Sequence, residues 1–312
     1  MSLLSHGKPV AILQYFTDRI DDYWHILYPP IELERRSEDP FLYFYDISRK
    51  ATDFSGPFSN EGIYLFKGYD GQWHIHALEI SQYALACWLA WRKSGDEKWA
   101  KKAMLHVKWL LEHQDENGAW YIKHKNPIYS DLPTPWSSAL AQALGISAIV
   151  RAYRYEKDDC YLQAAVKACE HLTTSHTKGG LRVAFEIKGV EGFIYEEYPR
   201  TQLSGVLNGY ISAVLALEEL SVFYREAESI SKENLRNLAE ILPLYDTGYW
   251  SLYALDGTLS SGFYHRYVTI QLQVLSERNE IFGDYARRFE RYAQTPFCAV
   301  RAFVTKIGQN RR

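Results

Sequence analysis

The chain has 312 residues, of which 47% are hydrophobic and 23% are charged; this composition excludes a disordered protein and suffices for one large domain or two small ones. The formal net charge of -3 at pH 7 excludes the basic surface that nucleic-acid backbones require, so we expect no nucleic-acid partner. Aromatic residues make up 15% of the chain, which fits either a large aromatic core or flat ligands such as sugar rings.

The N-terminal part of the chain, up to about residue 74, is irregular in pattern. Pro29-Pro30, Gly56-Pro57 and Gly62 interrupt short aromatic runs, which predicts loops and short strands. The start of the sequence lacks a basic region followed by an apolar stretch, and no segment is apolar enough to span a bilayer. We therefore expect a cytoplasmic protein with no membrane partner. The cysteines show no metal-type spacing and are interpreted as free thiols in a reducing compartment: Cys87, Cys160, Cys169 and Cys298.

From residue 75 onward, apolar residues recur at intervals of three and four, which is typical of amphipathic helices. We expect paired helices at 75–95 with 97–114, 137–157 with 161–175 and 204–224 with 232–244, then a helix at 268–279 and a tail helix at 280–294. This rhythm of hairpins predicts a mainly α protein. Residues 75–312 are expected to form an incomplete (α/α) toroid, with residues 1–74 as an irregular or β-containing segment packed on it.

Three loops between the expected helices are unusual in composition. They span residues 117–136, 179–201 and 245–265, and all are rich in Tyr, Trp, Gly or Pro. Loops contribute little to a core and lie on the surface, so aromatic loops indicate function more strongly than aromatic helices do. In a ring of hairpins these loops meet at one end, where ligand clefts often lie.

Two of these loops contain groups that could carry acid–base chemistry. Residues 195–200, Tyr-Glu-Glu-Tyr-Pro-Arg, offer two carboxylates, two phenols and a guanidinium; they could supply a base and an anion anchor, or simply cap and pack the next helix. Residues 263–266 add a phenol, an imidazole and a cation just before the expected helix at 268–279. His74 and His76 are interpreted as structural, because no further ligands complete a metal site. Phosphate-binding loops, nucleophile elbows and zinc-protease motifs are absent from the sequence.

Taken together and in order, these segments resemble the C-terminal catalytic domain of the D-glucuronyl C5-epimerases, which convert glucuronate to iduronate in heparan sulfate and heparosan. The resemblance rests on WLLEHQDENGAW, PWSSALAQALGISAIVRAY, YEEYPRTQLSGVLNGY, LPLYDTGYWSLY and a Tyr-His pair followed by QLQVL. It covers roughly residues 70 to 292. The larger β-rich region of animal members has no counterpart before residue 70.

The resemblance implies roles for particular residues. Its catalytic positions are Glu197, Tyr198, Tyr253 and Tyr264, and its substrate-binding positions are Trp136, Arg200, Asn208, Tyr245, His265 and Arg266. One position departs from the family, because Asp256 stands where animal members have a substrate-binding arginine; Arg200 or Arg266 would then replace it. The resemblance also implies a homodimer, an acidic polysaccharide as substrate, and neither metal nor cofactor.

Inversion at C5 of a uronate requires a proton to leave one face of the sugar and another to arrive on the opposite face. We expect Tyr198 and Tyr264 to act as acid or base, with a nearby cation lowering a phenol pKa, and Tyr253 to hydrogen-bond the uronate. Glu197 is expected to serve as a protonated acid or as the base itself. A polysaccharide lyase, a glycoside hydrolase and a non-catalytic glycan-binding protein remain alternatives, because fold-level analogy does not fix chemistry.

Overall fold

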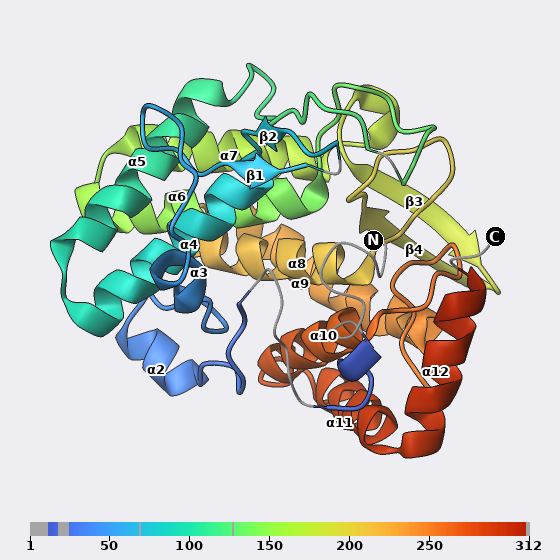
Figure 1. Cartoon of the computed structure of the whole chain (residues 1–312). Helices are drawn as coiled ribbons and strands as arrows, with labels where there is room; N and C mark the ends of the chain where they lie inside the picture. Colours follow the sequence, from blue (N-terminus) through green and yellow to red (C-terminus); the bar gives the residue numbers. More distant parts are fainter. Residues whose placement is uncertain (1–11, 18–24, 69, 127, 310–312) are drawn as a thin grey trace.

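The computed structural model describes residues 12–17, 25–68, 70–126 and 128–309. Figure 1 shows a mainly helical molecule with two small two-stranded antiparallel sheets. Most helices come in antiparallel pairs joined by short turns: α4 (Ala77–Ser94) with α5 (Glu97–His113), α6 (Ala139–Glu156) with α7 (Asp159–Thr173), α8 (Leu207–Ser221) with α9 (Glu226–Ile241), and α10 (Gly262–Leu275) with α11 (Glu280–Gln294). The sequence predicts the first three of these pairs.

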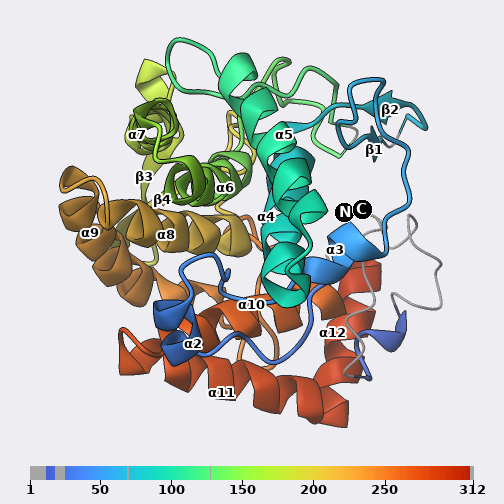
Figure 2. The same ribbon diagram turned by 90° about the vertical axis from the view of Figure 1, so that its left-hand side faces the viewer.

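The first helices of the four pairs form a continuous inner row. α4 packs on α6, α6 on α8 and α8 on α10, while each second helix packs on the outside of its own partner. Figure 2 shows the pairs from a second side, with α10 and α11 lying across the lower part of the view. In α6 every residue from Ala139 to Ala152 is buried, whereas α7 buries a single face. A helix that is apolar all round belongs inside a fold and an amphipathic one at its surface, so the two sequence patterns sort the helices into two layers.

Local signals in the sequence explain where the helices begin and end. Gly95 follows α4 in the left-handed conformation, with φ of 68°, which glycine adopts without a steric penalty. Asp96 then accepts a hydrogen bond from the backbone N–H of Lys98 and caps α5. Asp158 caps α7 and Asn279 caps α11 in the same way. Side-chain caps of this kind satisfy N–H groups that a helix end leaves without partners.

The helix bounds differ from the sequence expectation at three places. α9 begins at Glu226 rather than near residue 232, and α10 begins at Gly262 rather than at residue 268. The hydroxyl of Ser261 caps α10 by accepting from the N–H of Tyr264, so Tyr264 and His265 lie inside the helix and not before it. A further helix, α12 (Pro296–Gln309), follows the expected tail helix.

The N-terminal part contains short helices α2 (Leu33–Glu38) and α3 (Ser48–Thr52) and a hairpin of β1 (Phe66–Lys67) and β2 (Trp73–His74). α3 packs against α4. The buried guanidinium of Arg151 joins this part to the inner helices, because it donates to the carbonyls of Phe41 and Leu42 and pairs with Glu219 at 2.6 Å. These charge-assisted hydrogen bonds satisfy a charge that would be costly to bury alone.

The second hairpin comes directly before the residues of the candidate site. β3 (Arg182–Ile187) pairs with β4 (Val190–Tyr195) in a register that places Arg182 opposite Tyr195. β4 ends directly before the two adjacent glutamates, Glu196 and Glu197. Among the described residues, no helix is long and apolar enough to cross a membrane, and no group of three or more His, Cys, Asp or Glu side chains is arranged to hold a metal ion.

Candidate active site

Glu196 is buried and bound to the backbone. Its Oε1 accepts from the N–H groups of Ser204, at 2.8 Å, and Gly205, at 3.2 Å. Its own main chain bonds to Leu181 and Ala139 on either side. Burial raises its pKa to about 7, while the two N–H groups oppose that rise. The carboxylate therefore holds the loop before α8 in place, and its oxygen atoms face backbone donors rather than open space.

Glu197 is oriented differently. Its side chain is buried, with Oε1 3.5 Å from the hydroxyl of Tyr253, while Oε2 has no hydrogen-bond partner among the described residues. The carboxylate lies against the first turn of α8, because a Cβ added at Gly209 would stand 2.7 Å from Oε2. Burial raises the pKa of Glu197 to about 7, and hydrogen bonds from Tyr198 and Tyr253 oppose the rise. A carboxyl with this pKa exchanges protons readily at neutral pH.

Two tyrosines, Tyr198 and Tyr253, lie next to this carboxylate, and a third, Tyr264, packs against Tyr253. The rings of Tyr253 and Tyr264 lie edge to face with centroids 4.8 Å apart, and both residues are 8% exposed. Tyr198 is half-buried and follows Glu197 directly in the chain. Burial is the largest cause that raises the pKa values of Tyr198 and Tyr253 well above 10, and the neighbouring Glu197 adds to the rise. These phenols are therefore neutral at pH 7, contrary to the expectation of a lowered phenol pKa.

The loop at 117–136 completes the wall of the cluster. Backbone hydrogen bonds between Ile122 and Trp136 close most of this loop. The Trp136 ring lies 5.7 Å from the ring of Tyr198, and Tyr129 lies 4.8 Å from it on the same loop. Sequence analysis placed Trp136 in the site but missed Tyr129, whose only signal was its position in an aromatic loop.

Arg200 is present at the site, but carboxylates already neutralise its charge. Its Nε lies 3.0 Å from Asp131, its Nη1 lies 4.0 Å from Asp256, and its guanidinium stacks 4.4 Å over the ring of Tyr129. The aspartate that replaces the family arginine thus faces the cation expected to compensate for it. Asp131 was not among the sequence candidates, because nothing in its local pattern distinguishes it from a turn aspartate.

Asn208 lies in the first turn of α8, one residue before Gly209. Its side chain is fully buried, and neither the amide nitrogen nor the amide oxygen has a hydrogen-bond partner among the described residues. Buried amides normally find partners, and those that do not often mark a ligand or ordered water. Asn208 directly precedes Gly209, the residue that lies against the Glu197 carboxylate, and its unpartnered amide keeps it a candidate for the predicted contact with substrate.

His265 and Tyr245 do not reach this cluster, which corrects the sequence assignment. The two ring nitrogens of His265 bond to Ser251 and to the carbonyl of Phe289, and the ring stacks 3.7 Å from that of Trp250. Burial lowers its pKa to about 3, so it supplies no charge. Tyr245 donates to the carbonyl of Gly205 at 2.8 Å. Both residues support the loop that carries Tyr253.

Arg266, the last of the sequence candidates, follows His265 on α10. Its Nε lies 3.4 Å from the carbonyl oxygen of Gln14. The structure thus places this guanidinium beside the N-terminal part of the chain.

The sequence matches the model of the D-glucuronyl C5-epimerase C-terminus over residues 114–291, which is more than half of the chain. The chain belongs to this family. The residues that surround Glu197, from Tyr129 to Tyr264, all lie inside the matched range.

Two relatives place this family membership in context. A D-glucuronyl C5-epimerase from Caenorhabditis elegans is 32% identical over 211 residues, which span 59% of this chain and 34% of the relative. An uncharacterized protein from Methanocaldococcus jannaschii is 24% identical over 281 residues, spanning 81% of this chain and 89% of the relative. The chain thus covers about a third of the length of the nematode epimerase.

Among solved structures, a chain described as a novel alpha-amylase from Clostridium perfringens is similar with a TM-score of 0.45 and 11% identity, over 79% of this chain and 69% of that one.

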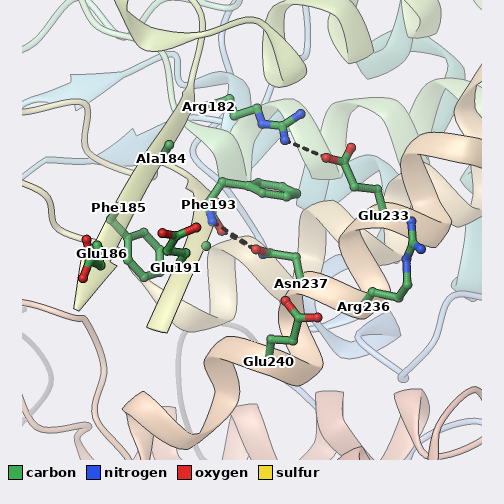
Figure 3. Close-up of a pocket in the computed structure, with 11 residues that line it drawn as sticks. Arg182, Ala184, Phe185, Glu186, Glu191, Phe193, Glu233, Arg236, Asn237 and Glu240 are labelled. Carbon is green, nitrogen blue, oxygen red and sulfur yellow. Dashed lines mark hydrogen bonds and ion pairs between the residues drawn. The ribbon is translucent and has the colours of Figure 1, made fainter. Parts of the chain in front are cut away.

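An open groove lies elsewhere, between the β3–β4 hairpin and α9. Figure 3 shows Arg182 paired with Glu233 and stacked over Phe193, with further carboxylates on both walls. Four glutamates and two arginines line it: Glu186, Glu191, Glu233, Glu240, Arg182 and Arg236. This excess of negative charge disfavours the binding of an acidic polymer in the groove.

Gly209 offers a test of the Glu197 geometry. We expect Gly209→Ala to lower activity about a hundredfold, because the new methyl group would displace the Glu197 carboxylate, and small misplacements of reacting groups are costly. Helix stability should not fall for reasons of propensity, since alanine favours helices by about 1 kcal/mol over glycine. Gly308→Ala in α12 is the matched control, because a Cβ there meets no atom within 4 Å. Equal activities of the two variants would contradict the described position of Glu197.

Proposed function

We propose that this protein converts D-glucuronate to L-iduronate residues within a heparosan-like polysaccharide by epimerisation at C5. The observation that carries the proposal is the buried Glu197 carboxyl with one oxygen near the Tyr253 hydroxyl and the other without a partner. This arrangement lies in the part of the chain that matches the epimerase family. In this proposal the four helix pairs form the incomplete toroid, and their loops present the reacting groups to the polymer.

Glu197 is the group best suited to remove the C5 proton. The proton lies alpha to a carboxylate, so it is only weakly acidic, and a base with a pKa near the working pH is most effective. Ionised Glu197 takes the proton and becomes neutral, leaving the electron pair of the broken C–H bond delocalised into the substrate carboxylate. The neutral phenols around Glu197 are acids rather than bases at this stage.

A phenol on the other face then completes the inversion. Tyr264 gives its proton to C5 and becomes a phenolate, and Tyr198 is the alternative donor. The cycle closes when the proton on Glu197 returns to the phenolate through the hydroxyl of Tyr253, which lies 3.5 Å from Oε1 and packs against the ring of Tyr264. Atoms and charges balance in this sequence without any external acid.

The charge that develops on the substrate carboxylate must also be stabilised. Asn208 offers a buried amide N–H without a partner among the described residues. Arg200 offers a guanidinium that Asp131 and Asp256 hold in position. We assign carboxylate recognition to these two side chains, with the tyrosine hydroxyls as further donors.

This mechanism predicts a pH dependence with a definite sign. Because Glu197 acts in its ionised form and burial raises its pKa to about 7, C5 exchange starting from glucuronate should increase about tenfold per pH unit below pH 7 and level off above it. Initial rates of deuterium incorporation, measured at constant ionic strength on either side of neutrality, test this. A rate that falls as the pH rises through 7 would assign the base role to another group.

Product analysis separates this function from the alternatives. A polysaccharide lyase shares the first step but leaves an unsaturated sugar that absorbs ultraviolet light. A glycoside hydrolase needs two carboxyl groups across the scissile bond, and Glu196 is committed to backbone N–H groups. Incubation with heparosan should yield iduronate without ultraviolet absorbance and without new reducing ends; a bound but unchanged polymer would indicate a glycan-binding protein.

A further inference from the structure

We propose that the β1–β2 hairpin and the adjoining loop form a second binding subsite for the acidic polysaccharide, next to the candidate active site. The inference rests on the proposed function, since it assigns the same polymer to both places. The hairpin lies outside the range that matches the epimerase family.

The hairpin presents an aromatic side chain beside a cation. Trp73 is 48% exposed, although tryptophan is a large apolar residue that usually packs inside. Lys67 lies directly opposite Trp73 in the strand pair, and its Nζ is 5.7 Å from the centre of the indole ring. An indole face stacks on the apolar face of a sugar ring, and an ammonium pairs with a uronate carboxylate. The pair therefore offers both contacts that a uronate-containing chain requires.

Neighbouring side chains fix this hairpin and extend its polar surface. Asp70 accepts a hydrogen bond from the ring of His74 at 2.8 Å, and both side chains lie within 3 Å of where a Cβ at Gly68 would stand. The His74 ring stacks on that of His124 with centroids 4.5 Å apart. Two exposed lysines, Lys123 and Lys125, flank His124 in the chain. A surface of cationic and aromatic side chains thus extends from the hairpin onto the loop at 117–136.

The loop connects this surface to the tyrosine cluster. The carbonyl of His124 lies 3.5 Å from the indole nitrogen of Trp136, and Trp136 packs on Tyr198. Three successive contacts therefore lead from Trp73 and His74 to a residue that touches Glu197. A polysaccharide whose reacting sugar lies at Glu197 extends beyond that site, and this aromatic and cationic surface is positioned to bind the continuing chain.

Binding measurements on two tryptophan variants test the subsite. Trp99 is the matched control, because it also pairs with lysines, Lys98 and Lys102, at 5.1 and 5.0 Å, but lies at the opposite end of the α4–α5 hairpin. We expect Trp73→Ala to weaken binding of long heparosan about tenfold. Its affinity for a short oligosaccharide that fills only the active site should be unchanged, and Trp99→Ala should bind both ligands normally. In turnover, Trp73→Ala should raise KM for the long polymer and leave kcat unchanged.

Lys67→Met serves as a second variant that retains the indole ring, and it should weaken binding of the long polymer in a salt-dependent way. Normal binding of the long polymer by both variants would overturn the subsite. Equal losses in Trp73→Ala and Trp99→Ala would overturn it as well, because they would indicate a nonspecific aromatic effect. Weakened binding in Trp73→Ala by a protein that exchanges no hydrogen at C5 would uphold the subsite while refuting the proposed epimerisation.

Discussion

Replacing Glu197 with glutamine is expected to lower C5 hydrogen exchange about 10²- to 10⁴-fold, the usual contribution of a general base. Glutamine has the size of the carboxyl and can still bond to Tyr253, but it cannot accept a proton at neutral pH. The measurement is deuterium incorporation into heparosan. Glu186→Gln is the control, since this glutamate is exposed on β3, away from the cluster.

The stability of the same variant separates a lost base from a damaged fold. Burial raises the folded pKa of Glu197 from 4.5 to about 7. Its contribution to stability is thus fully present below about pH 4.5 and is lost as the pH rises through about 7. Glutamine does not ionise, so the Glu197→Gln variant does not lose this stability as the pH rises. It should therefore be no less stable than the parent protein at pH 8. Exchange within about threefold of the parent rate would show that Glu197 is not the base.

Replacing Tyr264 with phenylalanine is expected to lower iduronate formation about a hundredfold or more, because it removes the proton donor on the opposite face of the sugar. The ring stays in place, so its contact with Tyr253 at 4.8 Å is retained. Tyr285→Phe is a matched control, because Tyr285 is 9% exposed against 8% for Tyr264 and lies on α11.

The product of Tyr264→Phe distinguishes the two candidate acids. If Tyr264 is the donor, the variant still removes the C5 proton of glucuronate slowly, but it forms little iduronate. If the variant forms iduronate at the parent rate, the assignment is wrong and Tyr198 becomes the donor to test.

Helix positions were predictable because they depend on local patterns. The period of apolar residues located three helix pairs and the two helices that follow them, and Gly95 marked the end of the first. The start of α10 was missed although Ser261 is a standard cap, because the aromatic run after it resembled a loop. α12 was missed because its exposed apolar side chains, such as Phe297 and Val304, weaken the amphipathic pattern.

The site was predictable only in part, since it depends on which loops meet. The resemblance to the family predicted that Glu197, Tyr253 and Tyr264 share one site, although they lie up to 67 positions apart in the sequence. Tyr129 and Asp131 enter the site only because the loop closes through Ile122 and Trp136, a long-range pairing that no local pattern encodes. The imidazole of His265 suggested chemistry, yet its ring stacks on Trp250 inside the core.

The most direct test of the central claim is incubation of the purified protein with heparosan in deuterated water, followed by nuclear magnetic resonance at C5. The account predicts deuterium at C5 together with new iduronate signals, and loss of both in Glu197→Gln. A polymer that keeps its C5 protons, or deuterium that appears equally in the Glu197→Gln variant, would contradict it.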